Sequence, residues 1–126
     1  MVIGLGIDVV DINRIRHWMD NPGLLARFFH PQELADMQSR GATAAYSLAA
    51  RFAAKEAYGK ALGTGLRAMT LKNILVTNSP SGRPLLTVYG DALLPFTLLE
   101  GSSIHLSLAH ESSIAIACVI LEGRER

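Results

Sequence analysis

The sequence predicts an α+β fold, with one long helix and shorter helices packed on a mostly antiparallel sheet. The segment Ala44 to Leu62 is rich in alanine and long enough to be the principal helix. The first ten residues alternate with a period of two, and segments 74–89 and 104–121 each hold two strand-like runs around a polar turn. Helices gathered against antiparallel hairpins define this class.

Length and composition indicate a single domain, residues 1–126, and exclude several classes of protein. A chain of 126 residues with 49% hydrophobic content can build one core. A net charge of +1 gives no general basis for nucleic-acid binding. No apolar stretch approaches roughly 18 residues and no signal segment opens the chain, so we expect a soluble cytoplasmic protein without membrane insertion. Cys118 is the only cysteine, and in its apolar run it is expected to be a small buried hydrophobe.

The N-terminal segment has the period of a half-buried strand. Its odd positions from 3 to 9 are apolar, whereas Gly4, Gly6 and Asp8 share the other face. Aspartate is uncommon inside strands, and two neighbouring glycines leave room for a ligand to approach the backbone. The alternative is an aspartate at a strand end that is hydrogen-bonded to a nearby loop.

Two short helices are expected before the long one. The first is capped by Asp11 and ends at Asn21-Pro22-Gly23, and the second begins at Pro31 and ends at Gly41. One face of the first helix is basic, with Arg14, Arg16 and His17. This face is either an ordinary solvated surface or a docking surface for an acidic partner.

The long helix carries a carboxylate and a lysine on one face. Glu56 and Lys60 are four residues apart, and Phe52 places this face beside the apolar stripe, so the carboxylate is expected to be partly shielded. The pair is either a surface ion pair or, with Asp8, a site for Mg²⁺, which prefers few protein carboxylates plus phosphates and waters. Gly63-Thr64-Gly65 is either a helix cap or a nest of amides for phosphate.

The C-terminal half is expected to hold two hairpins and a short helix. The strands Ile74–Thr77 and Leu85–Tyr89 form the first hairpin, and the weak helix 91–99 follows. The second hairpin turns at residues 110–113. Its histidines lack zinc-site spacing, and no serine has the context of a nucleophile elbow.

Three blocks of sequence carry a resemblance to a known family. They are Gly4–Val10, Arg51–Ala57 with Lys60–Gly65, and His105–Glu111. In this order they resemble the bacterial holo-acyl-carrier-protein synthases. The resemblance implies the 4′-phosphopantetheinyl transferase fold, a homotrimer with coenzyme A bound between subunits, and a role in fatty-acid biosynthesis. The implied reaction moves 4′-phosphopantetheine from coenzyme A to a serine of acyl carrier protein, with Mg²⁺ and with loss of adenosine 3′,5′-bisphosphate.

The resemblance also implies roles for particular residues. Asp8 and Glu56 would hold Mg²⁺, and Lys60 would neutralise phosphate charge. The expected coenzyme-binding positions are Arg51, Lys60, Gly63, Gly65, Pro84 and His110. Arg14, with Arg27 as a weaker companion, would contact the acidic carrier protein. The family's alanine-rich helix is replaced here by Leu93-Leu94-Pro95-Phe96 within residues 91–99, which leaves the length of that helix open.

Two points stay open at the level of sequence. The serine proton could pass to Glu56 through a water or to a hydroxide on the metal. Two rival functions are a regulatory module that binds coenzyme A without transfer and a purely structural trimerisation domain. The regulatory module predicts that Asp8→Ala leaves coenzyme binding largely intact and that no transfer to any carrier is detectable. The trimerisation domain predicts no saturable coenzyme binding.

Overall fold

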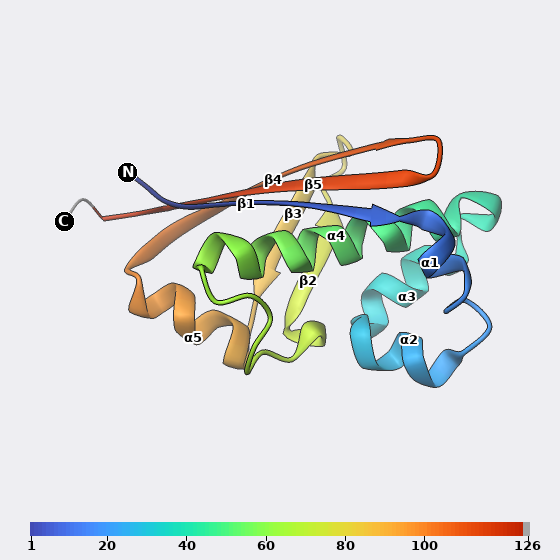
Figure 1. Cartoon of the computed structure of the whole chain (residues 1–126), viewed down its shortest axis with the longest axis horizontal. Coiled ribbons are helices and arrows are strands. Elements are labelled where there is room, and N and C mark those ends of the chain that lie inside the picture. The colour runs from blue at the N-terminus through green and yellow to red at the C-terminus, as the bar shows by residue number, and fades with distance from the viewer. Residues whose placement is uncertain (125–126) are drawn as a thin grey trace.

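The computed structural model describes residues 1–124 (Figure 1). Ten helices and strands, with two short 3₁₀ turns, follow in order within these residues: β1 (Val2–Asp11), α1 (Ile12–Arg16), α2 (Pro22–Phe28), α3 (Pro31–Gln38), η1 (Gly41–Thr43), α4 (Ala44–Leu62), η2 (Leu71–Asn73), β2 (Ile74–Asn78), β3 (Pro84–Val88), α5 (Gly90–Leu98), β4 (Gly101–Glu111) and β5 (Ile114–Gly123). The predicted bounds of the long helix are confirmed, and α5 forms despite Pro95. The second hairpin turn is tighter than expected, since β4 continues through His110 to Glu111. None of the described helices has the length and apolar character needed to cross a membrane.

The strands form two antiparallel sheets. One has the order β1-β5-β4, and the other is the hairpin of β2 and β3, with β3 lying against β4. The long helix α4 runs along one face of the larger sheet, and the shorter helices lie on the same side (Figure 1). The α+β class is therefore confirmed, with the strands divided between two sheets.

The face of β1 that carries the glycines is turned toward α4. A Cβ added to Gly6 would lie 2.0 Å from the carbonyl oxygen of Ala57, and one added to Gly4 would lie 2.2 Å from that of Ala61. The expectation that these glycines leave room for a ligand was wrong, because the backbone of α4 fills that space. Their small size lets helix and strand touch directly.

The apolar face of β1 points away from the core. Leu5, Ile7 and Val9 are 64%, 58% and 56% exposed. Leu5 lies opposite Ile120 of β5, and Ile7 lies opposite Cys118. Cys118 is accordingly half-buried on this outer face, and the prediction that it lies in the core was wrong.

The N-terminal segment holds one helix more than the sequence predicted. Asp11 caps α1 as expected and accepts a hydrogen bond from the backbone N–H of Asn13 at 2.9 Å. Asn21 then caps α2 through the N–H of Leu24 at 3.1 Å, so the predicted stop is a helix start. Pro22 fits there because the first turn of a helix has N–H groups without intrahelical partners.

A buried ion pair joins α3, α4 and β2. Lys55 Nζ donates to Glu33 Oε1 at 2.7 Å, and both side chains are fully buried. Lys55 also donates to the carbonyl oxygens of Leu71 and Ile74, and Glu33 accepts from the N–H of Val76. Burial lowers the pKa of Lys55, and the charge of Glu33 opposes this effect. Sequence reasoning missed the pair, because nothing in its spacing distinguishes these residues from surface charges.

Candidate active site

The first group of predicted site residues meets where β1 runs along α4. Asp8 lies on the helix-facing side of β1, and its side chain is 15% exposed. Lys60 Nζ donates to Asp8 Oδ1 at 2.8 Å. This hydrogen bond, together with the charge of Asp8, raises the pKa of Lys60. Lys60 of α4 therefore pairs with Asp8 of β1. The alternative, a surface ion pair between Glu56 and Lys60 within the helix, is not observed.

Glu56 lies close enough to Asp8 for the two carboxylates to repel each other. Partial burial raises the pKa of Glu56, and the negative charge of Asp8 raises it further, whereas Arg14 and Lys60 oppose the shift. Within residues 1–124 no group donates a hydrogen bond to the carboxylate of Glu56. Two crowded carboxylates, one without a donor, are the type of oxygen pair that a divalent cation relieves.

These two carboxylates do not form a complete metal cage. Among the described residues, no three His, Cys, Asp or Glu side chains are grouped so that they could hold a metal ion. A cation between Asp8 and Glu56 would therefore need ligands from outside the protein. Mg²⁺ fits this donor set, because it commonly binds through one or two carboxylates plus waters and substrate phosphates.

A basic and aromatic surface adjoins Asp8 and Glu56, which we call the acidic pair. Arg14 lies over the ring of Phe52 at 5.2 Å and over that of Trp18 at 5.4 Å from the ring centroids. Trp18 also packs edge-on against Phe52, and Arg27 lies over Phe28. The rings hold the Arg14 guanidinium beside the acidic pair rather than leaving it free in solvent. The sequence pointed to the two arginines but not to the rings beneath them, because Trp18 lies past the end of α1.

The glycines after α4 form a helix cap. The N–H of Gly63 donates to the carbonyl oxygen of Lys60 at 3.0 Å, and that of Gly65 donates to Gly59 at 2.9 Å. Both glycines have positive φ, 82° and 67°. Of the two alternatives for this segment, the cap is observed, and these two N–H groups are not free to bind phosphate. A role for either glycine in coenzyme binding stays a prediction.

A second group of predicted residues gathers elsewhere. Arg51 is buried and donates to Asp36 Oδ2 at 2.5 Å and to Asn78 Oδ1 at 3.4 Å. The Nε of Arg51 has no hydrogen-bond partner among the described residues. Burial lowers the pKa of the Arg51 guanidinium. Arg51, Asn78 and His110 line one hollow of about 190 Å³, and Pro84 pairs with Asn78 across the β2–β3 hairpin.

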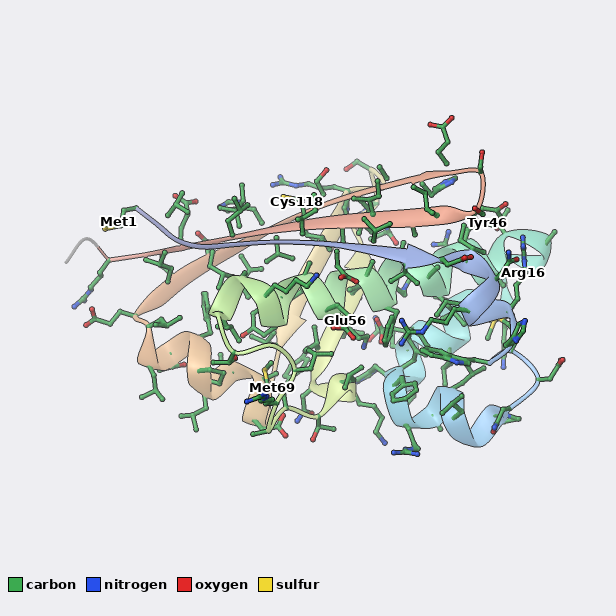
Figure 2. All side chains as sticks on the ribbon, viewed as in Figure 1. Met1, Arg16, Tyr46, Glu56, Met69 and Cys118 are labelled. Carbon is green, nitrogen blue, oxygen red and sulfur yellow. The ribbon has the colours of Figure 1, made fainter. Side chains whose placement is uncertain are left out.

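The predicted site residues thus form two separate groups within one chain. Asp8, Glu56 and Lys60 line no part of the hollow that holds Arg51 and His110. Figure 2 shows Glu56 beside the middle of α4, with Met69 nearer to α5. Arg51 instead contacts Ser47 and Asn78, toward the smaller sheet.

The whole chain is similar to one class of protein. The family model described as the 4′-phosphopantetheinyl transferase superfamily matches residues 4–119. The holo-[acyl-carrier-protein] synthase of Treponema denticola is 52% identical over 123 residues, which cover 98% of this chain and 100% of that protein.

Solved structures agree with the same assignment. The holo-[acyl-carrier-protein] synthase of Neisseria meningitidis has a TM-score of 0.86 at 32% identity, covering 97% of this chain and 99% of that one. The synthase of Bacillus anthracis, solved in complex with coenzyme A (3′,5′-ADP), has a TM-score of 0.82 at 33% identity and covers 98% and 99%. This chain belongs to the holo-[acyl-carrier-protein] synthase family, as its motif blocks predicted.

Proposed function

We propose that this protein transfers the 4′-phosphopantetheine arm of coenzyme A to a serine of apo acyl carrier protein. The products are holo acyl carrier protein and adenosine 3′,5′-bisphosphate. The observation that carries the proposal is the meeting of Asp8, Glu56 and Lys60 at one place, in a chain of this family. Coenzyme A as the donor is supported by the complex of the Bacillus anthracis relative.

The chemistry requires charge neutralisation and positioning more than covalent participation by the protein. Asp8 and Glu56 would hold Mg²⁺, which supplies Lewis-acid polarisation of phosphoryl oxygens when it is bound. Lys60, whose pKa is raised, stays protonated and offsets negative charge at the phosphates. The serine oxygen attacks the β-phosphorus, the bond to the α-phosphate oxygen breaks, and Glu56 accepts the serine proton through a water.

Arg14 and Arg27 form the proposed contact with the carrier protein. The Arg14 guanidinium lies over Phe52 and acts on the charge of Glu56. Arg27 lies over Phe28, which packs against Phe52. An acidic partner bound there would bring its serine to Asp8 and Glu56. Charge complementarity of this kind acts mainly on the association rate and on orientation.

We further propose that the protein is a homotrimer in the cytoplasm. Leu5, Ile7 and Val9 form an exposed apolar row on the outer face of the larger sheet, where a partner subunit would bury them. Within one chain, Asp8 and Glu56 do not line the hollow at Arg51 and His110. In the trimer, the hollow of one subunit would lie beside Asp8 and Glu56 of its neighbour. A subunit interface would explain both the apolar row and the divided site.

The test is intact-mass spectrometry of apo acyl carrier protein incubated with coenzyme A and the purified protein, with Mg²⁺ or with EDTA. We expect the phosphopantetheine mass to be added only with the metal. Asp8→Asn and Glu56→Gln should each lose most of this activity while remaining folded. Saturable coenzyme A binding without any mass gain on the carrier would instead favour the regulatory module.

A further inference from the structure

The hollow at Arg51 and His110 is bordered by three side chains that contact one another and come from three elements. The rings of Tyr46 on α4 and His110 on β4 lie with their centroids 5.4 Å apart, at an angle of 54°. The guanidinium of Arg16 on α1 lies 5.6 Å from the centroid of the Tyr46 ring. Tyr46 and His110 both line the hollow. Figure 2 shows Tyr46 and Arg16 at the end of the molecule where β4 turns into β5.

The hydroxyl of Tyr46 holds the turn that follows His110. It donates a hydrogen bond to the carbonyl oxygen of Ser112 at 3.1 Å. Ser112 has a φ of 51°, a left-handed conformation that is unfavourable for serine, so the turn depends on contacts from outside it. A second contact comes from α1, where the N–H of Ile12 donates to the carbonyl oxygen of Ser113 at 2.7 Å. The end of β4 is thereby held against both α1 and α4.

The imidazole of His110 is held by little else. His110 is exposed at the end of β4, and within residues 1–124 no group forms a hydrogen bond with its ring. Both ring nitrogens are therefore open to a ligand in the hollow. An exposed side chain without a packing partner samples several rotamers, and a ligand that binds it must offset the loss of that freedom. The ring of Tyr46 limits this freedom before any ligand binds.

We propose that Tyr46 is a positioning residue for coenzyme A, which rests on the transferase function proposed above. Its ring sets the direction of the His110 imidazole, and its hydroxyl sets the position of the turn. The guanidinium of Arg51 is already fixed, because it donates hydrogen bonds to Asp36 and Asn78. With His110 held as well, the polar side of the hollow is formed before the coenzyme arrives, as small-molecule sites usually are.

Tyr46 takes no part in the chemical step. It precedes Glu56 on α4 by about 15 Å along the helix axis, at the standard rise per residue. Asp8 and Glu56 line no part of the hollow. Loss of the Tyr46 ring should therefore weaken coenzyme binding and leave the rate of transfer at saturating coenzyme nearly unchanged. The sequence gave no signal for this role, since Tyr46 lies outside the three blocks that resemble the family.

The experiment separates the ring of Tyr46 from its hydroxyl. Coenzyme A binding is measured by isothermal titration calorimetry with Mg²⁺ and without carrier protein, so that no turnover occurs. Tyr46→Leu removes the ring, and the dissociation constant should rise about two- to tenfold, which is the contribution of an aromatic pair. Tyr46→Phe keeps the ring, so the dissociation constant should stay within about 1.5-fold of the wild-type value. Tyr89→Leu makes the same change at an exposed tyrosine outside the hollow and is the matched control, which should bind coenzyme A as the wild type does.

A double variant tests whether the effect acts through His110. In a His110→Ala background the ring contact no longer exists, so Tyr46→Leu should not weaken binding further. In transfer assays, Tyr46→Leu should raise the KM for coenzyme A and leave both kcat and the KM for apo acyl carrier protein within about twofold of wild type. Additive losses in the double variant would mean that Tyr46 acts independently of His110 and would overturn the proposal. Equal weakening by Tyr46→Phe and Tyr46→Leu would assign the effect to the turn and overturn the role of the ring.

A further readout uses the wild-type protein alone. In NMR spectra, nuclear Overhauser effects should connect the ring protons of Tyr46 with the imidazole protons of His110, because the two rings are in contact. Absence of these effects, or coenzyme A binding by Tyr46→Leu equal to that of the wild type, would overturn the proposal while transfer by the wild type continued. Failure of the wild-type protein to use coenzyme A as a donor would reject the transferase function instead.

Discussion

Removing one partner of the Glu33–Lys55 pair should destabilise the protein far more than removing a surface ion pair. Both side chains are fully buried, and Lys55 Nζ donates to Glu33 and to two backbone carbonyls. In Glu33→Ala the ammonium loses its counter-ion but cannot reach water. Breaking a buried pair in this way costs about 3–5 kcal/mol, a large part of the 5–15 kcal/mol that stabilises a typical domain.

The matched control is Arg40→Met. Arg40 binds Asp36 at 2.9 Å, but both side chains are more than a third exposed. An exposed pair of this kind contributes about 0–1 kcal/mol. Asp36 also keeps its hydrogen bond from Arg51 in this variant.

The assay is urea unfolding followed by circular dichroism, at one fixed protein concentration because an oligomer's stability depends on it. The double variant Glu33→Gln/Lys55→Met should be more stable than Glu33→Ala, because it leaves no unpaired charge. If Glu33→Ala cost no more than Arg40→Met, the pair would not be buried as described. The single variants Glu33→Gln and Lys55→Met complete the cycle, and if the double variant simply added their two losses, the coupling between the residues would be refuted.

Three further predictions concern the site and the sheet. Gly6→Ala should lower the free energy of unfolding in urea by about 1–3 kcal/mol, because its Cβ would meet the carbonyl of Ala57 at 2.0 Å. Gly63→Ala is the control: its Cβ would meet nothing within 4 Å, so the free energy of unfolding should fall by only about 1 kcal/mol, because of the positive φ at this position. Glu56→Gln should raise the melting temperature slightly at pH 7 without Mg²⁺. Because the pKa of Glu56 is raised in the folded protein, its ionised carboxylate destabilises the folded state, and this destabilisation increases as pH rises through that pKa. An equal gain at pH 4 would contradict this cause. Ile7→Asp should shift sedimentation toward monomer and abolish transfer, and a trimer that survived it would exclude the outer face as the interface.

The sequence was sufficient for every helix and strand except α2, but not for the direction in which the elements face. The bounds of α4 followed from its alanines and from the glycine cap, which are local signals. The period of β1 was also correct. A period of two identifies two faces of a strand, however, and does not say which one the helix covers. Here the glycine face is covered, because only it lets α4 approach the backbone.

The same limit applies to the site residues. Asp8, Glu56 and Lys60 could be grouped from motifs, and the structure brings Asp8 and Lys60 within hydrogen-bond distance. Arg51 could not be placed, since its contacts to Asp36 and Asn78 join segments far apart in the sequence. Long-range contacts of this kind leave no periodic signal.

The face of β1 that carries Gly4, Gly6 and Asp8 connects the fold to the proposed chemistry, because it is the face turned toward α4. Gly4 and Gly6 bring the strand against α4, and Asp8 is the next residue on that face. Its carboxylate therefore reaches Lys60 one helical turn beyond Glu56. A larger residue at position 6 would push the helix away and separate the groups that neutralise phosphate. The glycines thus act as positioning residues, so Gly6→Ala should lower kcat more than its loss of stability alone would require.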